Sequence, residues 1–551
     1  MSWFRKNKKK KENWITEEER LAIIKKSSKQ VSRGVFFATV IIITSFLPVF
    51  LLTGQEGKMF HPIAFTKTFI MIVDAFLVLT LAPVLISFFM KGKFRPDNAN
   101  PANRFLERIY TPVIHWVMKW RKTTIAVNIL ALLISIPLLR SLGTEFMPPL
   151  DEQSILFMPV TLPDISNAEI KRILQVQDKI IKSVPEVDKV LGKAGRANTA
   201  TDNSPISMIE TIIMLKPHKE WREGVTKADI IRELDAKLQI PGVVNGWTQP
   251  IINRINMLST GIRTDVGIKV YGQSLDTIAA VSERVKTVLE GTAGLADLYV
   301  EPITGGKYLA IDIRRADLGR YGLTVDDVNQ TIETALGGAP IGQTFEGRQR
   351  FAITARLAQD YRNSAENIKR IPLQSSAFGE VPLSAVADIR FEDGPPMISS
   401  ENALLRGAVL FNVRDRDLGS TVQEAMEKLN QQKGILPAGY FLEWSGQYEN
   451  LIRGKQTLMW IAPIVLVIIF FSLYFAFHSI REAFLSLITI PFALIGGAYI
   501  IYFWGANLSV GVAVGFIALF GIAVETGIVM VIYLNDAMAQ LIARKGNSKD
   551  T

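Results

Sequence analysis

This chain of 551 residues contains few of the side chains that most often bind metals or act as nucleophiles. It contains no cysteine, and its four histidines are scattered at His61, His115, His218 and His478. The lack of thiols excludes disulfide frameworks, thiolate catalysis and cysteine-based metal sites. The scattered imidazoles do not match a helical or finger-type zinc site. Methionine is therefore the sulfur donor that remains, with fifteen copies.

Met257 illustrates what such a methionine could do. It stands in NRINMLSTGIRTDVGIKV, between a turn that carries arginine and what we expect to be the start of a β-strand. A neutral, polarizable thioether can act as a ligand for a soft metal ion. Methionine also fills irregular gaps in protein cores. On local sequence, Met257 is a core plug, an idle surface residue or a metal ligand.

Two acidic residues interrupt apolar segments. Glu525 stands alone in GFIALFGIAVETGIVMVIYL, and Asp74 stands in FIMIVDAFLVL. An ionised carboxylate in a bilayer is costly unless it is paired, protonated or hydrated, so Glu525 is a functional candidate or a structural acid hydrogen-bonded across helices. Gly521 precedes it by one helical turn, and Gly511 with Gly515 forms a small-xxx-small face that predicts close helix packing. For Asp74 we expect a packing or hydrogen-bonding role.

Long apolar runs in the sequence predict the helices that carry the two acidic residues. Hydrophobic residues make up 48% of the chain and charged residues 21%, which indicates a membrane protein with a large aqueous part. Six runs reach the roughly 20 residues needed to cross a bilayer. They are 35–53, 65–90, 123–141, 458–477, 483–503 and 508–534. Lysine and arginine crowd the segments 1–34, 91–122 and 536–551, which are therefore predicted to be cytoplasmic, with the large middle region on the opposite side.

Periodicity in the middle region alternates between two and 3.6 residues, which predicts alternating strands and helices. We expect strand, helix and strand at 154–160, 166–184 and 208–216, and again at 267–272, 275–290 and 295–302. Ser166 and Glu169 predict a capping box. In an insert, RRADLGRYG is expected to be a strand that leads into a capped helix ending at Gly337. The prediction is a six-span α-helical membrane bundle with an α+β region of ferredoxin-like βαβ subdomains.

Several function classes are disfavoured. No nucleophile–base pair or phosphate-binding loop is recognisable, and the glycines of GGAPIGQTFEGRQ do not form a dinucleotide fingerprint. The chain is therefore not expected to be an enzyme or to hold a cofactor. The net charge of +10 follows from the membrane topology, and the basic N-terminus lacks interleaved aromatic residues, so nucleic acid is not an expected partner.

Three strings resemble one family. FLPVFLLTGQEGKMFHPIAFTKT, RADLGRYGLTVDDV and GFIALFGIAVETGIVMVIYL are similar to the resistance-nodulation-division (RND) exporters, and in particular to their heavy-metal branch of CusA-like copper and silver exporters. The resemblance divides the chain into a basic segment, three spans with a cytoplasmic loop at 91–122, porter subdomains, a docking-type insert, the return of a porter subdomain, three spans and a tail. The expected boundaries are 1–34, 35–141, 142–304, 305–396, 397–455, 456–535 and 536–551.

The resemblance also assigns residues. It implies that Met158, Met208 and Met257 hold the transported Cu(I) or Ag(I), and that Glu525 belongs to the proton relay. Charged residues are expected along the cleft that leads to the metal: Glu152, Asp202, Glu210, Arg254 and Arg263. Arg263 departs from the lysine of the copper exporters, which keeps the charge but changes the donor geometry.

The implied assembly is a homotrimer in the cell inner membrane, with a large periplasmic domain, a periplasmic adaptor and an outer-membrane channel. In this family a subunit has twelve spans, whereas this chain matches the fifth to the tenth. We therefore expect an incomplete pump whose other spans lie elsewhere, from a truncated gene, a split subunit or an assembly artefact. The alternatives are export of divalent metals or drugs, and a membrane scaffold that binds partners without transport.

Overall fold

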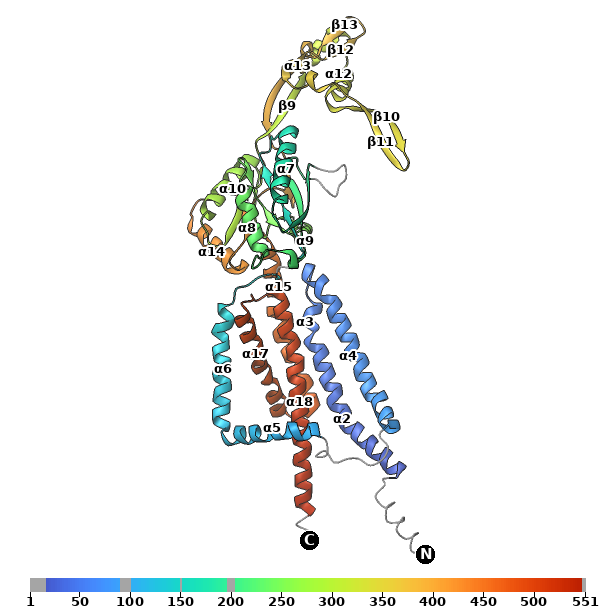
Figure 1. Cartoon of the computed structure of the whole chain (residues 1–551), viewed down its shortest axis with the longest axis vertical. Helices are drawn as coiled ribbons and strands as arrows, with labels where there is room; N and C mark the ends of the chain where they lie inside the picture. Colours follow the sequence, from blue (N-terminus) through green and yellow to red (C-terminus); the bar gives the residue numbers. More distant parts are fainter. Residues whose placement is uncertain (1–15, 90–100, 149–150, 196–203, 548–551) are drawn as a thin grey trace.

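The computed structural model describes residues 16–89, 101–148, 151–195 and 204–547. These residues form three tiers along the long axis of the molecule (Figure 1). A bundle of long helices lies at one end, an α+β head follows it, and an elongated insert lies farthest from the bundle. The start of the first described helix and the end of the last one lie at the end of the bundle away from the head.

The bundle contains the predicted spans. Six helical segments among the described residues are long and apolar enough to cross a membrane. Their helices are α2 (Glu17–Ser45) with α3 (Leu47–Phe50), α4 (Gly54–Phe89), α6 (Arg121–Ser141), α15 (Gln447–Phe477), α16 (Ile480–Leu487) with α17 (Thr489–Trp504), and α18 (Val510–Asn547). The first helix starts far before residue 35, because Thr16 and Glu19 form a complete capping box there.

The described part of the predicted cytoplasmic loop at 91–122, from residue 101 onward, is largely helical. Residues 101–119 form α5 (Pro101–Lys119), which lies across the end of the bundle away from the head (Figure 1). Its apolar side chains, including Phe105, Ile109 and Trp116, are exposed. An amphipathic helix in this position fits the interface of a bilayer, which explains why a charged segment between spans is not an extended loop.

The first module of the head has the predicted ferredoxin-like plan. Its four-stranded sheet has the order β3 (Val187–Ala194), β4 (Ile209–Leu215), β1 (Ser154–Phe157) and β6 (Trp247–Thr248). The helices α7 (Asn167–Lys182) and α8 (Lys227–Lys237) pack apolar faces on it. Ser166 caps α7 as expected, but Glu169 binds Arg172, so the reciprocal half of the capping box is absent.

The second module repeats the plan with a long insertion. Its strands have the order β8 (Leu295–Val300), β16 (Leu404–Val413), β7 (Val266–Gly272) and β17 (Phe441–Gly446), and a short β15 (Ser399–Glu401) also pairs with β16. The helices α10 (Leu275–Leu289) and α14 (Leu418–Gln431) contribute to the same core. Every residue of the central strand β7 is buried. The predicted fold class, a six-span bundle with ferredoxin-like modules, is therefore confirmed.

The insert leaves the second module after β8 and returns before β15. A two-stranded ribbon of β9 (Gly306–Ile313) and β14 (Ala387–Gly394) carries a small core of helices and hairpins. The segment predicted as a strand from RRADLGRYG is instead the helix α11 (Arg315–Tyr321), which ends at Gly322 in the left-handed conformation. The next helix α12 (Val325–Ile332) has a full capping box of Thr324 and Asp327, and a π-turn extends it to Gly337.

The remaining strands of the insert form two hairpins. They are β10 (Ala339–Glu346) with β11 (Gln349–Ala355), and β12 (Pro372–Ser375) with β13 (Gly379–Pro382). The first hairpin projects away from the body of the insert (Figure 1).

Candidate functional site

Met257 lies on the helix that joins the two modules, α9 (Pro250–Thr260). The expectation of a turn that leads into a strand was wrong at this position. Proline fits the first turn of a helix, and Gly261, at φ +72°, ends α9 by donating its N–H to the Met257 carbonyl oxygen at 3.0 Å. The carboxylate of Glu152 accepts the N–H groups of Ile251 and Ile252 at 2.8 and 3.0 Å. Glu152 thus caps the helix and does not line the cavity.

Met158 and Met208 lie at one edge of the first module. The strand predicted over 154–160 is interrupted, since β1 ends at Phe157 and β2 (Val160–Thr161) begins beyond Pro159. Met158 sits in this break, where its N–H donates to the Gly246 carbonyl oxygen at 2.8 Å. Met208 pairs with Val160 through an isolated bridge. Both methionines are buried and pack in one cluster against Tyr299.

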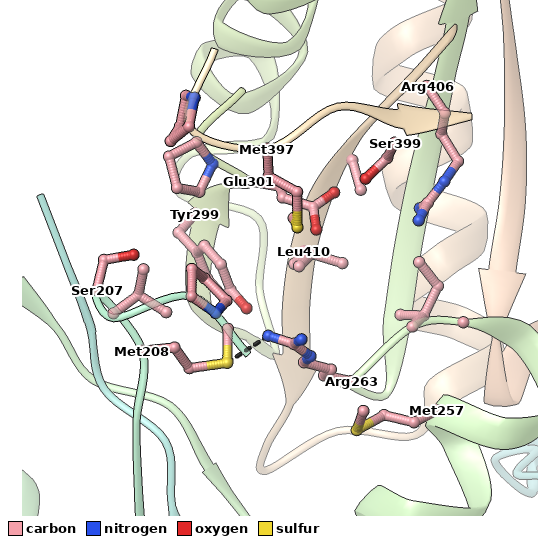
Figure 2. Close-up of a pocket in the computed structure, with 17 residues that line it drawn as sticks. Ser207, Met208, Met257, Arg263, Tyr299, Glu301, Met397, Ser399, Arg406 and Leu410 are labelled. Atoms are coloured by element: carbon pink, nitrogen blue, oxygen red, sulfur yellow. Dashed lines mark hydrogen bonds between the residues drawn. The ribbon is translucent and has the colours of Figure 1, made fainter. Parts of the chain in front are cut away.

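A cavity of about 300 Å³ lies between the first module and the second. Met208 and Met257 line it together with Arg263 (Figure 2). A smaller adjoining cavity of about 20 Å³ shares Met208, Arg263 and Tyr299, and Met158 lines it. The three methionines that lie about fifty residues apart in sequence therefore converge around one arginine.

Two of the sulfur atoms already accept hydrogen bonds. The Arg263 guanidinium donates to Met208 Sδ, and Asn253 Nδ2 donates to Met257 Sδ at 3.6 Å. Arg263 extends between the two methionines (Figure 2). Nearby, burial raises the pKa of Tyr299, while the charge of Arg263 opposes this rise and the charge of Glu301 adds to it. The site is thus a cavity lined by polarizable and apolar side chains, together with Arg263, Arg406 and Glu301 as charged groups.

The other predicted cleft residues are not brought into this cavity. Glu210, on β4, forms an ion pair with Lys193 at 2.7 Å and accepts a hydrogen bond from Ser204. Arg254 is exposed on α9. Asp202 lies outside the described residues. Of the four described residues that were expected along the path, Arg263 is the one that lines the cavity.

Sequence reasoning missed four side chains of the cavity wall: Tyr299, Glu301, Met397 and Arg406. Met397 and Glu301 reach into the cavity from the side opposite Met257 (Figure 2). Both flank the points where the insert leaves and rejoins the second module. The available signal was the double proline at 395–396, which marks the return of the chain directly before Met397.

In the membrane bundle, Glu525 lies on α18 and is half-buried. A Cβ atom at Gly521 would lie 2.9 Å from the Ile42 Cα atom and Ser45 Oγ, so α18 approaches α2 closely one turn before Glu525. A Cβ atom at Gly515 would meet no atom within 4 Å among the described residues, so no described helix packs closely against this glycine.

The surroundings of Asp74 differ from the packed position that the sequence predicted. It lies exposed on α4, and no hydrogen bond or ion pair to it is found within the described part of the chain. The described residues thus provide no hydrogen-bonding partner for Asp74, and its expected role stays a prediction. A lone acid in an apolar segment was the sole basis for that expectation.

Comparisons with known proteins agree with these observations. The chain matches the AcrB/AcrD/AcrF family over residues 5–546. It is 42% identical to the cation efflux system protein CusA of Escherichia coli K12, over 95% of this chain and 50% of that protein. It is 32% identical to the cobalt-zinc-cadmium resistance protein CzcA of Cupriavidus metallidurans, over 98% of this chain and 51% of that protein.

A solved structure described as a heavy metal efflux pump, crystal form II, has a TM-score of 0.78 and 30% identity to this chain. The match covers 91% of this chain and 50% of the solved one. The chain thus spans about half the length of the relatives it matches. It belongs to the AcrB/AcrD/AcrF family of RND transporters, as the resemblance predicted, and it is similar to the cation efflux system protein CusA within that family.

Proposed function

We propose that this chain is part of an RND exporter that moves soft monovalent metal ions, Cu(I) or Ag(I), and that Met158, Met208 and Met257 are the ligands. The observation that supports this most is the convergence of the three methionines on two adjoining cavities between the modules. Thioether ligands need no deprotonation and favour soft cations. The protein would then act as a transporter rather than as an enzyme.

The surroundings of the site argue against hard divalent ions as cargo. No cluster of three or more histidine, aspartate or glutamate residues with metal-binding geometry occurs among the described residues. Zinc and cobalt sites favour imidazole, carboxylate and thiolate ligands. Divalent metal export remains the second candidate because the cobalt-zinc-cadmium resistance protein CzcA is also a relative.

Proton coupling is assigned to Glu525. It is half-buried on α18, beside the close contact of α18 with α2. A carboxylate at this depth changes charge at a cost set by its neighbours, so its protonation can be coupled to helix movement. No hydrogen bond or ion pair of Glu525 is found within the described residues, and a partner in another chain or another part of the pump would complete the relay.

For the assembly we propose a homotrimer in the cell inner membrane, with the head in the periplasm, a periplasmic adaptor and an outer-membrane channel. The hairpin β10–β11 projects far from the insert and exposes Ile341, Phe345 and Ile353. Exposed apolar side chains on a projecting hairpin suit contact with another protein chain. Since the chain spans about half of its relatives, the remaining transmembrane segments would be supplied by further sequence or by another chain.

Metal titration of the full chain in detergent micelles tests the proposed substrate. Ag(I) and Zn(II) are added in competition with a chelator of known affinity. We expect Ag(I) to bind with a preference of at least about 100-fold over Zn(II), which corresponds to about 2.7 kcal/mol. The substitution Met257→Ile should weaken Ag(I) binding at least about tenfold.

The matched control is Met214→Ile. Met214 is an exposed methionine on β4 that lines neither cavity, so its loss should leave Ag(I) binding unchanged. Zinc preference, absence of Ag(I) binding, or equal effects of the two substitutions would contradict the proposed substrate. In particular, absence of any metal binding would favour a scaffold role.

A further inference from the structure

The cavity between the modules contains opposite charges that are not paired with each other. Arg263 donates to the neutral sulfur of Met208, and no carboxylate partner for it is found among the described residues. Glu301 Oε2 is buried and has no hydrogen-bond partner within the described part of the chain. Both side chains line the cavity, and both charges act on the hydroxyl group of Tyr299.

The third charge of the cavity is already matched. Arg406 lies 3.6 Å from Glu401, and Glu401 also binds the buried Lys269 at 3.0 Å. Arg406 is therefore not the obvious partner for Glu301. The carboxylate of Glu301 and the guanidinium of Arg263, which donates to the Met208 sulfur, therefore have opposite charges that could pair with each other.

The arginine hydrogen bond occupies one of the two lone pairs of the Met208 sulfur, which makes that sulfur a poorer ligand for a metal ion. The ion and the guanidinium would also repel each other, since both are positively charged. Transfer of the guanidinium to a buried carboxylate removes both obstacles, because a charge-assisted hydrogen bond replaces a weak one to sulfur.

We propose that Arg263 is a movable gate on Met208 and that Glu301 is the acceptor to which its guanidinium moves when a monovalent metal ion binds the methionines. This inference rests on the proposed function and assigns Glu301 as a positioning residue. The gate also favours monovalent cargo, since the repulsion from Arg263 is twice as large for a divalent ion.

A double-mutant cycle on the full chain in detergent micelles tests the gate. Ag(I) affinity is measured for the wild type, Glu301→Gln, Arg263→Gln and the double variant. We expect Glu301→Gln to weaken Ag(I) binding about tenfold in the presence of Arg263 and less than about twofold in its absence, since such coupling is the signature of two residues that act together. Glu301→Asp, which keeps the charge, should recover most of the affinity.

The control is Glu380→Gln, which removes an exposed acid of the insert on β13 and should not change the affinity. Equal effects of Glu301→Gln in both arginine backgrounds, or no effect in either, would overturn the gate while leaving the proposed substrate intact. Loss of Ag(I) binding in the wild type, or binding that does not depend on Met257, would overturn the proposed function and the gate together. Thermal unfolding of each variant distinguishes these results from misfolding.

Discussion

The two modules of the head share one strand order but bury different kinds of side chain. The first module places Met158 and Met208 at its edge and closes its base with an ion pair between Glu186, which is fully buried, and Arg222. The second module carries two partly buried acids, Asp265 and Asp297, and the carboxylate of Asp297 accepts the N–H of Trp247 from the first module. The same strand order therefore carries methionines in one module and partly buried acids in the other.

The second module is also the one that continues into the membrane. Its last strand β17 leads directly into α15, and the N–H of Gln447 at the start of α15 donates to the Asp265 carbonyl oxygen at 2.8 Å. Gln447 Nε2 donates to the Asp265 carboxylate at 2.7 Å. The modules thus differ in that the first carries Met158 and Met208, two of the proposed ligands, and the second bonds to the start of α15.

Loss of the ion pair at the base of the first module should have the largest effect. Arg222→Ala leaves Glu186 buried without a cation, whereas Arg222 now holds the pKa of that carboxyl below its usual range. We expect the unfolding free energy of the first module to fall by about 4 kcal/mol. Denaturant unfolding in micelles, followed by tryptophan fluorescence, measures it. Arg232→Ala, which breaks an exposed ion pair with Asp229, should lower the unfolding free energy by less than about 1 kcal/mol. Equal losses in the two variants would contradict the larger contribution expected of the ion pair of Glu186.

The acids of the second module should make it sensitive to pH. Burial raises the pKa of Asp265 to about 6, although the Val413 N–H donates to it. Because the folded state holds this proton more tightly than the unfolded state, the stabilisation is complete below about pH 4 and is lost as the pH rises through 6. We expect a loss of up to about 3 kcal/mol across this window. Asp265→Asn should flatten the profile of unfolding against pH, and an unchanged profile would contradict this assignment.

Contact between the modules depends on Asn412, which is buried and bonds to both of them. Its Nδ2 donates to the Trp247 carbonyl oxygen at 3.0 Å and to Asp297 at 2.8 Å. We expect Asn412→Ala to cost about 1.5 kcal/mol and to weaken Ag(I) binding about fivefold by loosening the cavity. Hydrogen exchange at the Trp247 amide should accelerate. Asn245→Ala is the matched control, because Asn245 forms its hydrogen bonds within the first module. Faster exchange in both variants would argue against a specific role of Asn412 in holding the modules together.

Substitution of Met397, which lines the cavity from the second module, should have the smallest effect on Ag(I) binding. Met397 lines the same cavity as Met208 and Met257, but it is not among the proposed ligands. Met397→Ile keeps an apolar side chain of similar volume, and we expect it to weaken Ag(I) binding about twofold to threefold. The same chelator competition measures this change. A loss as large as that of Met257→Ile would make Met397 a ligand and would shift the site toward the second module.

Periodicity predicted one strand, one helix and a second strand in each module, because each of these elements buries one face at a regular spacing. It did not predict α8 in the first module or α14 in the second. The helix around Met257 was readable in principle, since Pro250 and Gly261 mark its two ends. The role of Glu152 was not readable, because it depends on a contact with a helix about 100 residues later. The wall residues Glu301 and Met397 were missed for a similar reason, as an insert separates them in sequence and the fold brings them together.

X-ray absorption at the silver edge of the full chain with one equivalent of Ag(I) tests the central claim most directly. A site of three methionine thioethers predicts a first shell of sulfur atoms without nitrogen or oxygen. Met257→Ile should remove one sulfur from that shell, and Met214→Ile should leave it unchanged. A shell dominated by nitrogen or oxygen, or a sulfur shell that is the same in both variants, would contradict the account.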